Sequence, residues 1–334
     1  MELTILGCNA AVPTATRYPS SQVLSVGGHL FLIDCGEGTQ FQLRRLHVNI
    51  MRIEAVFISH NHGDHVFGLI GLLSTMSLFS RSSPLSIFAP PELETIMGPL
   101  IETYCDNLTY KIYFHKLRFD KPDVLQGIRC AYVKSIPLKH RVDTCGFYFR
   151  ELPKEPNIKK AAIYKYGLTI ADIVSVKSGR KIFDINGDEI PRDELVKDAP
   201  QPKSYAYISD TSYLPSIAQE IMGVSLLYHE STFLSDLQDL AVKTLHSTAR
   251  QAAMVAKEAR ACKLLLGHFS SRYDSTDCFE DEAKAVFPDT TAVYEGFKIV
   301  FLERLITLVR ARIVVFLRLS LLILAFRYAR MSIG

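Results

Sequence analysis

Residues 59–65 read Ser-His-Asn-His-Gly-Asp-His, so three histidines and one aspartate occupy the six positions from 60 to 65. Imidazole and carboxylate groups together are typical ligands of zinc, with manganese and iron as alternatives. On extended backbone His60 and His62 point the same way, whereas Asp64 and His65 turn toward a different point. The segment therefore predicts half of the ligand set for each of two neighbouring ions. A plain polar loop with surface histidines is the disfavoured alternative.

The chain on either side of this segment indicates how it would be held. Residues 53–58 form a mostly apolar run that is typical of a buried strand. Residues 66–79 are apolar with few turn formers, which favours a helix. The metal-type side chains would therefore lie on a strand-to-helix loop, where they can converge from several directions.

The same order, an apolar strand followed by a histidine or a carboxylate, recurs later in the chain. It is found after the expected strands at 129–136, 205–208, 226–228 and 264–266. Sites in layered α/β proteins gather where strands end, so we expect the residues at these ends to join the cluster. They are His140, Asp210, His229, Glu230 and His268.

Other runs predict the elements that would support these strand ends. The glycine-rich residues 34–39 permit a tight turn or a close approach of backbone to a ligand. A helix is expected over 247–261, capped by Ser247 or Thr248, with His246 at its start. Further strands are expected at 3–6, 23–26, 30–33, 85–88 and 112–117, and further helices at 40–46 and 93–104.

Residues 150–203 differ in character from the rest of the chain. They are rich in lysine and glutamate and lack long apolar runs. The pair Asn186-Gly187 between two short apolar segments predicts a hairpin. We interpret the segment as an inserted arm that contacts another molecule, with a disordered linker as the alternative.

Bulk composition sets broad limits. A length of 334 residues suits one large domain or two smaller ones, and a hydrophobic content of 48% allows a sizeable core. The formal net charge of +3 neither requires nor excludes a nucleic-acid partner. Seven cysteines without a CxxC pair favour reduced thiols in a cytosolic protein. The first residues lead directly into an expected strand, so we expect no secretory signal.

Residues 301–334 break the pattern of the preceding chain. After Glu303 they contain six arginines and no acidic residue, spread among large apolar residues. Arg318 interrupts the apolar run, so a transmembrane span of about twenty residues is not expected. A basic helix on a membrane surface and an atypical or out-of-frame extension are both open, and we assign this tail no catalytic role.

Several motifs resemble the ribonuclease Z family of the metallo-β-lactamase superfamily, over residues 1 to about 295. His60-x-His62-x-Asp64-His65 resembles the signature of the superfamily. Residues 6–21 and 34–40 are similar to the opening blocks of the family. The motifs specific to it are His-Glu-Ser-Thr at 229–232, His-Ser-Thr-Ala at 246–249 and Gly-His-Phe-Ser-Ser-Arg-Tyr at 267–273.

The resemblance implies an α/β fold, a four-layer αβ/βα metallo-β-lactamase sandwich over residues 1–300 with a tRNA-binding arm inserted at about 150–203. It also implies two Zn²⁺ ions per subunit, a homodimer and a cytoplasmic location, with no obligatory protein partner. One ion would be held by His60, His62, His140 and Asp210. The other would be held by Asp64, His65, Asp210 and His268.

The activity implied is removal of the 3′ trailer from precursor tRNA, leaving a 3′-hydroxyl on the tRNA and a 5′-phosphate on the trailer. Asp64 would orient and deprotonate the attacking water, His246 would act at the scissile phosphate or leaving oxygen, and Glu230 would fix the tautomer of His246. Contacts to RNA are expected from Ser270, Arg272 and Tyr273 near the cut, and from Lys177, Arg180 and Lys181 on the arm.

Two other functions stay open. Another hydrolase of the same fold, such as a small phosphodiesterase, a thioesterase or a lactonase, would need the metal ligands but neither the arm nor the Glu230 and His246 pair. A catalytically silent module that binds RNA or a protein partner would have no need of seven metal-ligand positions.

Overall fold

The computed structural model describes residues 1–105, 108–301 and the backbone of 306–308, so most of the basic tail expected at 301–334 lies outside the described residues. The chain divides into two compact units. The first consists of Met1–Arg150 together with the chain from Ser204 onward, and the second is Glu151–Lys203. Within the described residues, no helix has both the length and the hydropathy needed to cross a membrane.

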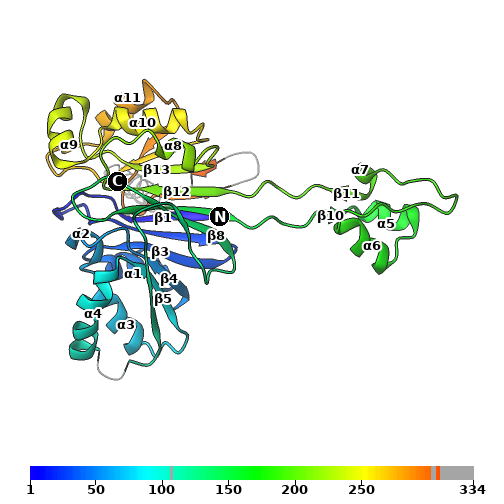
Figure 1. Ribbon diagram of the computed structural model, residues 1–334, viewed down its shortest axis with the longest axis horizontal. Helices are drawn as coiled ribbons and strands as arrows, with labels where there is room; N and C mark the ends of the chain where they lie inside the picture. Colours follow the sequence, from blue (N-terminus) through cyan, green and yellow to red (C-terminus); the bar gives the residue numbers. More distant parts are fainter. Residues whose placement is uncertain (106–107, 302–305, 309–334) are drawn as a thin grey trace, which may run out of the picture. The chain divides into compact units, whose positions relative to one another are not determined.

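The first unit is built on two sheets (Figure 1). Over the described residues, the first sheet has the strand order β17 (Ile306–Leu308), β16 (Lys298–Phe301), β1 (Glu2–Gly7), β2 (Ser21–Val26), β3 (His29–Cys35), β4 (Ile53–Phe57), β5 (Leu85–Ala89) and β6 (Ile112–Lys116). The second sheet has the order β15 (Thr290–Ala292), β14 (Leu264–Gly267), β13 (Leu226–Glu230), β12 (Ser204–Ile208), β9 (Cys145–Glu151), β8 (Ala131–Pro137) and β7 (Asp123–Val124).

Strand direction explains why one edge of each sheet carries the chemistry. β1, β2 and β3 form an antiparallel meander, and β3 to β6 are then parallel to one another. In the second sheet β12, β13, β14 and β15 are parallel. The carboxyl ends of neighbouring parallel strands meet at the same edge, which is where ligands bind in such sheets.

Helices cover the outer face of each sheet. On the first sheet they are α1 (Thr39–Arg45), η1 (Ile50–Arg52), α2 (Gly63–Val66), α3 (Leu69–Leu78) and α4 (Pro91–Tyr104). On the second they are α8 (Ile217–Glu220), η2 (Ser235–Leu237), α9 (Gln238–Thr244), α10 (Ala249–Glu258) and α11 (Asp277–Lys284). Figure 1 shows the two sheets lying between these two sets of helices, so the expected four-layer αβ/βα sandwich is confirmed.

Side chains alternate between the two faces of each strand, so the two faces of the first sheet belong to two different hydrophobic cores. Phe31 of β3 and Phe57 of β4 face the second sheet, where their ring centroids lie 6.1 and 5.1 Å from that of Phe149 in β9. The intervening Leu32 and Val56 belong instead to the core beneath α1, α3 and α4. Burying an aromatic side chain of this kind contributes about 1.5–3 kcal/mol, so the sheet is held from both sides.

The single helix expected over 66–79 is wrong at its start. The structure has α2 and α3 instead, with a break at Gly68. The N–H of Gly68 donates to the carbonyl of Cys35 at 2.9 Å, and a Cβ at this position would lie 2.1 Å from the carbonyl oxygen of Gly36. Because the backbone of β3 and its turn passes so close, the chain bends there. The short α2 that results carries Asp64 and His65.

The second unit has a small core of its own. Its elements are β10 (Asn157–Ile158), α5 (Lys160–Tyr166), α6 (Ile170–Lys177), α7 (Arg192–Leu195) and β11 (Val196–Lys197). Ala162, Val176 and Leu195 pack together in it and are almost fully buried. The hairpin expected around Asn186-Gly187 is reduced to a turn with one isolated bridge between Phe183 and Glu189. A disordered linker, the alternative at this position, does not describe this segment.

Candidate metal centre and active site

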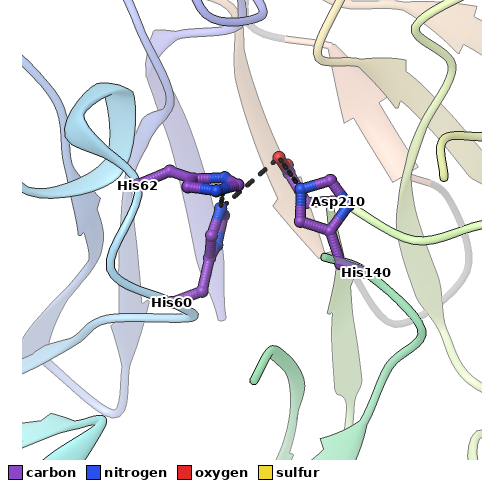
Figure 2. Close-up of side chains that lie close together, drawn as sticks. All are labelled: His60, His62, His140 and Asp210. Atoms are coloured by element: carbon purple, nitrogen blue, oxygen red, sulfur yellow. Dashed lines mark hydrogen bonds and ion pairs between the residues drawn. The ribbon is translucent and has the colours of Figure 1, made fainter. Parts of the chain in front are cut away.

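Histidine and aspartate side chains from separate strand ends meet in the first unit. His60, His62, His140 and Asp210 offer ligand atoms that all lie within 4.8 Å of one another (Figure 2). Asp64, His65 and His268 form a second group that meets the same limit. These are the seven residues that the sequence assigns to two metal positions, divided in the same way apart from the shared Asp210.

Asp210 lies between the two groups and faces both. Its Oδ2 is 3.5 Å from Nε2 of His60 and 3.9 Å from Nε2 of His140. Its Oδ1 is 3.4 Å from Nε2 of His65 and 3.1 Å from Nε2 of His268. One carboxylate thus presents one oxygen to each group, which is the arrangement required of a bridging ligand.

Backbone strain marks the strand ends that supply the site. Asp34 near the end of β3, Asp210 after β12 and His268 after β14 all have positive φ, at 55°, 55° and 57°. Left-handed conformations are unfavourable for residues with a Cβ and persist only where the surroundings hold them. Here the turn redirects each side chain from the sheet toward the cluster.

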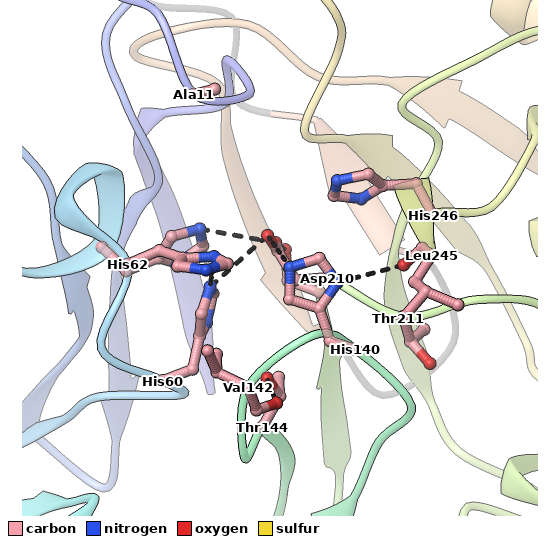
Figure 3. Close-up of polar contacts among 12 residues, drawn as sticks. Ala11, His60, His62, His140, Val142, Thr144, Asp210, Thr211, Leu245 and His246 are labelled. Carbon is pink, nitrogen blue, oxygen red and sulfur yellow. Dashed lines mark hydrogen bonds and ion pairs between the residues drawn. The ribbon is translucent and has the colours of Figure 1, made fainter. Parts of the chain in front are cut away.

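Neighbouring groups fix which nitrogen each imidazole offers. The N–H at Nδ1 of His140 donates to the carbonyl of Leu245 at 3.1 Å, so Nε2 faces Asp210 (Figure 3). Nδ1 of His65 lies 2.7 Å from the carboxylate of Asp34, so its Nε2 is likewise directed at the cluster. Partners of this kind orient metal-binding imidazoles and raise their basicity.

His246 and Glu230 form a separate pair at the edge of the cluster. Nδ1 of His246 lies 2.9 Å from the carboxylate of Glu230, which also accepts hydrogen bonds from the N–H of Thr211 and the hydroxyl of Thr232. Burial acts to lower the pKa of His246, but the charge of Glu230 outweighs it and raises the pKa to about 9. His246 is therefore a cation at neutral pH that can give up a proton.

The charges of the cluster fit a divalent metal ion. Burial raises the pKa of Asp210 and of Asp64, but the surrounding histidines lower both well below the usual range, so both are ionised. Within the described residues, Nε2 of His65 and Nε2 of His268 are buried and contact the carboxylate of Asp210 without a hydrogen bond, which is costly for a polar atom. A cation among these nitrogens and carboxylates would satisfy them together, and this donor set suits zinc, manganese or iron.

Comparisons with known proteins decide the family. Ribonuclease Z from Bacteroides thetaiotaomicron is 40% identical over 295 residues, covering 88% of this chain and 93% of its own length. Ribonuclease Z from Phocaeicola vulgatus is 39% identical over 298 residues, covering 89% and 96%. This chain belongs to the ribonuclease Z family. The family resemblance inferred from the motifs is confirmed.

Solved structures agree with this assignment. The short form of human tRNase Z has a TM-score of 0.65 and 27% identity, covering 90% of this chain and 99% of its own. The metallo-β-lactamase-fold protein YhfI from Bacillus subtilis, at a TM-score of 0.62 and 20% identity, covers 89% and 98% and shows the shared fold. A family model described as anti-Pycsar protein Apyc1 matches residues 1–150, the part of the chain before the second unit.

Only some of the expected RNA-contacting residues lie in the pocket over the cluster. A cavity of about 250 Å³ opens over the cluster, and its lining includes Ser270 and Arg272 beside Asp64 and His246. Tyr273 packs into the protein instead, with its hydroxyl accepting the N–H of Leu234 at 3.2 Å and its ring 4.8 Å from that of Phe279. His229 is fully buried outside the metal-type groups, with Nδ1 bonded to a backbone carbonyl.

The arm residues Lys177, Arg180 and Lys181 belong to the second unit. Lys177 pairs with Glu155 at 3.2 Å and Lys181 pairs with Glu189 at 2.7 Å, both on the surface. Arg180 has no ion-pair partner within the described residues.

Sequence reasoning missed Asp34 and Thr232. Asp34 accepts from the N–H and hydroxyl of Ser59 and from the hydroxyl of Tyr207, in addition to holding His65. The hydroxyl of Thr232 donates to Glu230, so its oxygen accepts from Nδ1 of His268 at 3.0 Å. Asp34 stands where an expected strand ends, the same signal that identified the other residues, but it was interpreted only as part of a turn.

Proposed function

We propose that this chain is a metal-dependent endoribonuclease that cuts precursor tRNA and removes its 3′ trailer. The observation that carries the proposal is the pair His246–Glu230 beside the histidine and aspartate cluster, in a chain about 40% identical to proteins named ribonuclease Z. The cluster alone would serve many hydrolases. A proton donor at the edge of the cluster, in a pocket lined by Arg272, is suited to a phosphodiester with a poor leaving group.

The metal ligands are proposed to hold two ions, zinc by preference and manganese or iron as alternatives. His60, His62 and His140 would bind the first, and Asp64, His65 and His268 the second, with Asp210 between them. When bound, two such ions lower the pKa of water and stabilise charge that develops on phosphoryl oxygens.

Asp64 is proposed to orient the attacking water and accept its proton. The N–H of Ala11 donates to Oδ2 of Asp64 at 2.9 Å, from a backbone with φ of 50°. This bond fixes the carboxylate at the mouth of the pocket, where it faces the cluster and solvent. Because its low pKa keeps Asp64 ionised, the carboxylate is ready to accept a hydrogen bond from water.

His246 is proposed to protonate the leaving oxygen. Glu230 keeps it charged and leaves Nε2 free to donate. In-line displacement in which the 3′ oxygen of the tRNA is the leaving group gives a 3′-hydroxyl on the tRNA and a 5′-phosphate on the trailer.

The second unit is proposed to bind the folded body of the tRNA. Its basic residues include the exposed Arg180 and Lys181 and the half-buried Lys177, and phosphate contacts from such residues depend on charge more than on base sequence. The two ion pairs there are exposed and worth about 0–1 kcal/mol, so a phosphate can replace the glutamate.

A homodimer is proposed as the functional assembly. Phe41 of α1, Phe67 before α3 and Leu78 of α3 are 67%, 70% and 80% exposed on adjoining helices. Large apolar side chains this exposed are typical of an interface, and a second copy would cover them. Light scattering on the wild type and on Phe67→Glu tests this, and a monomeric wild type would contradict it.

The test of the proposed function is cleavage of a precursor tRNA that carries a 3′ trailer, with both product ends mapped at several divalent metals. Trimming at one site with a 3′-hydroxyl on the tRNA is expected. Hydrolysis of bis(p-nitrophenyl) phosphate without trimming would favour another hydrolase of the fold. Purified protein with less than one bound ion per chain, and with neither activity, would favour a binding module.

A further inference from the structure

A second unpartnered arginine lines the active-site pocket. Arg141 follows the metal-type residue His140 directly in the sequence and lies in the pocket lining together with Arg272. It is exposed, and its guanidinium has no ion-pair or hydrogen-bond partner within the described residues. Asp143, on the same loop, is exposed as well and does not pair with it.

The loop that carries Arg141 is fixed at both ends. The N–H of Lys139 donates to the hydroxyl of Thr211 at 3.2 Å, and its carbonyl accepts the N–H of Ser212 at 2.9 Å. At the other end, the carbonyl of Thr144 accepts the N–H of Leu138 at 2.9 Å. The backbone of Arg141 is therefore held in place beside the cluster, while its side chain keeps the freedom to meet a ligand.

The charge of Arg141 opposes the metal cluster it adjoins. Arg141 lines the same pocket as His62 and His140. Within the described residues its guanidinium pairs with no carboxylate, so its donors are available to an anion that enters the pocket. A planar guanidinium with free donors is suited to a phosphate, which it can bind through two hydrogen bonds.

We infer that Arg141 binds the phosphate next to the scissile one in an RNA strand that crosses the pocket. The inference rests on the proposed function, because it takes the substrate to be a polynucleotide. The scissile phosphate lies over the cluster between Asp64 and His246, and its neighbour along the strand reaches the rim where Arg141 stands. Arg141 thus favours a chain of phosphodiesters over an isolated one and takes no part in bond cleavage.

The test separates one phosphate from several. Hydrolysis of bis(p-nitrophenyl) phosphate reports on the cluster alone. A uridine dinucleotide, with one phosphate, and a uridine tetranucleotide, with three, are added as competitive inhibitors over a range of salt. The variants are Arg141→Ala, Arg141→Gln and Arg141→Lys. Arg129→Ala is the matched control, because Arg129 is an exposed arginine just before β8, the same strand that leads at its other end to Arg141.

The wild type is expected to bind the tetranucleotide more tightly than the dinucleotide. Arg141→Ala and Arg141→Gln should remove most of that difference and reduce the slope of log affinity against log salt by about one unit, and should affect hydrolysis of the small diester much less. Arg141→Lys should retain part of the difference, since lysine keeps the positive charge but cannot donate the two parallel hydrogen bonds of a guanidinium. Arg129→Ala should behave as the wild type.

Three results would overturn the inference: a wild type that does not distinguish the two oligonucleotides, an Arg141→Ala variant that keeps the full difference, or one that loses hydrolysis of the small diester to the same extent. Metal content and melting temperature of each variant show whether the fold is intact, and Arg141→Gln keeps the side-chain length if the alanine variant is unstable. The inhibition requires no trimming. If precursor tRNA is not cut while the oligonucleotide difference stands, the proposed function fails and this inference does not.

Discussion

The metal cluster and the second unit hold their charges in opposite ways. In the cluster, Asp34 and His65 are fully buried, and the carboxylate of Asp34 accepts hydrogen bonds from three different residues. In the second unit, the pair Lys181–Glu189 has side chains that are 70% and 45% exposed. Buried networks fix geometry because breaking one leaves an unpaired charge, whereas exposed pairs exchange partners at little cost. The first region is built for chemistry and the second for contact.

The comparison predicts that damage to the cluster affects every substrate, and the largest effect is expected from Asp64→Ala. Turnover of both precursor tRNA and bis(p-nitrophenyl) phosphate should be abolished, because the variant loses a metal ligand and the acceptor for the attacking water. The fold should survive, since Asp64 is at the pocket mouth, and thermal unfolding measures this. A folded variant that keeps more than about a tenth of the wild-type rate would contradict the role of Asp64 in water activation.

His246→Ala should slow precursor tRNA cleavage by about 10²–10⁴, the usual contribution of a general acid. The physical reason is that the leaving ribose oxygen departs poorly without a proton. A substrate with a p-nitrophenolate leaving group needs no such help and should be affected much less. Rates on the two substrates, at equal metal content, measure the difference. Equal losses on both would place His246 among the metal ligands instead.

Deleting residues 155–195 is the corresponding change in the second unit. Binding of precursor tRNA should weaken by about a hundredfold, as expected when a few phosphate contacts are lost, with bis(p-nitrophenyl) phosphate hydrolysis unaffected. Of the buried residues in the small core of this unit, only Val196 lies outside the deleted segment, so the deletion leaves little of that core exposed. Filter binding and hydrolysis rates provide the measurement. If the deletion slowed the reaction of both substrates to the same extent, the second unit would not be a separate tRNA-binding region.

The site was more predictable from sequence than the elements that support it. Histidine and aspartate at successive strand ends identify the candidate ligands, because parallel strands bring those ends together. Asp34 stands at such an end too, and its partner Ser59 follows β4, the parallel neighbour of β3. Its contact with the hydroxyl of Tyr207 could not be predicted, because it depends on the packing of the two sheets. The break at Gly68 could not be predicted either, because it depends on a backbone carbonyl far away in the sequence.

Local signals were also present and overlooked. β9 alternates buried Cys145, Phe147 and Phe149 with more exposed residues over part of its length, a strand pattern that was not predicted. Helix α6 begins with a capping box between Thr169 and Asp172, whereas the polar composition of 150–203 predicts an inserted arm with a hairpin and no helix. The interpretation follows the composition of the whole segment, although the four-residue capping box is the physical reason why a helix begins there.

Glu230→Gln should change the pH dependence of the cluster more than its maximum rate. The wild-type rate should fall as pH rises through about 9, where His246 loses its proton. Without the carboxylate the pKa of His246 drops, so this fall moves to lower pH and costs about tenfold in rate at pH 8. The pair also stabilises the fold below the unfolded-state pKa of 6.5, and this contribution disappears as pH rises through about 9. Rate profiles and melting temperatures at several pH values test both, and an unmoved profile would exclude Glu230 as the partner.

The smallest effect is expected from single charges of the second unit. Arg180→Ala should weaken precursor tRNA binding a few-fold and lower the salt slope by about one unit, since an unpaired arginine gives a phosphate contact at no competing cost. Lys165→Ala is the control, because Lys165 pairs with Glu194 on the same unit and is not among the expected contacts. Substituting Lys181 should have an intermediate effect on tRNA binding, because a phosphate must first displace Glu189 from it. The decrease in salt slope on substitution by alanine is therefore predicted to be largest for Arg180, smaller for Lys181 and smallest for Lys165. If Lys165→Ala weakened tRNA binding as much as Arg180→Ala, binding would depend on net charge alone and not on contacts at particular residues.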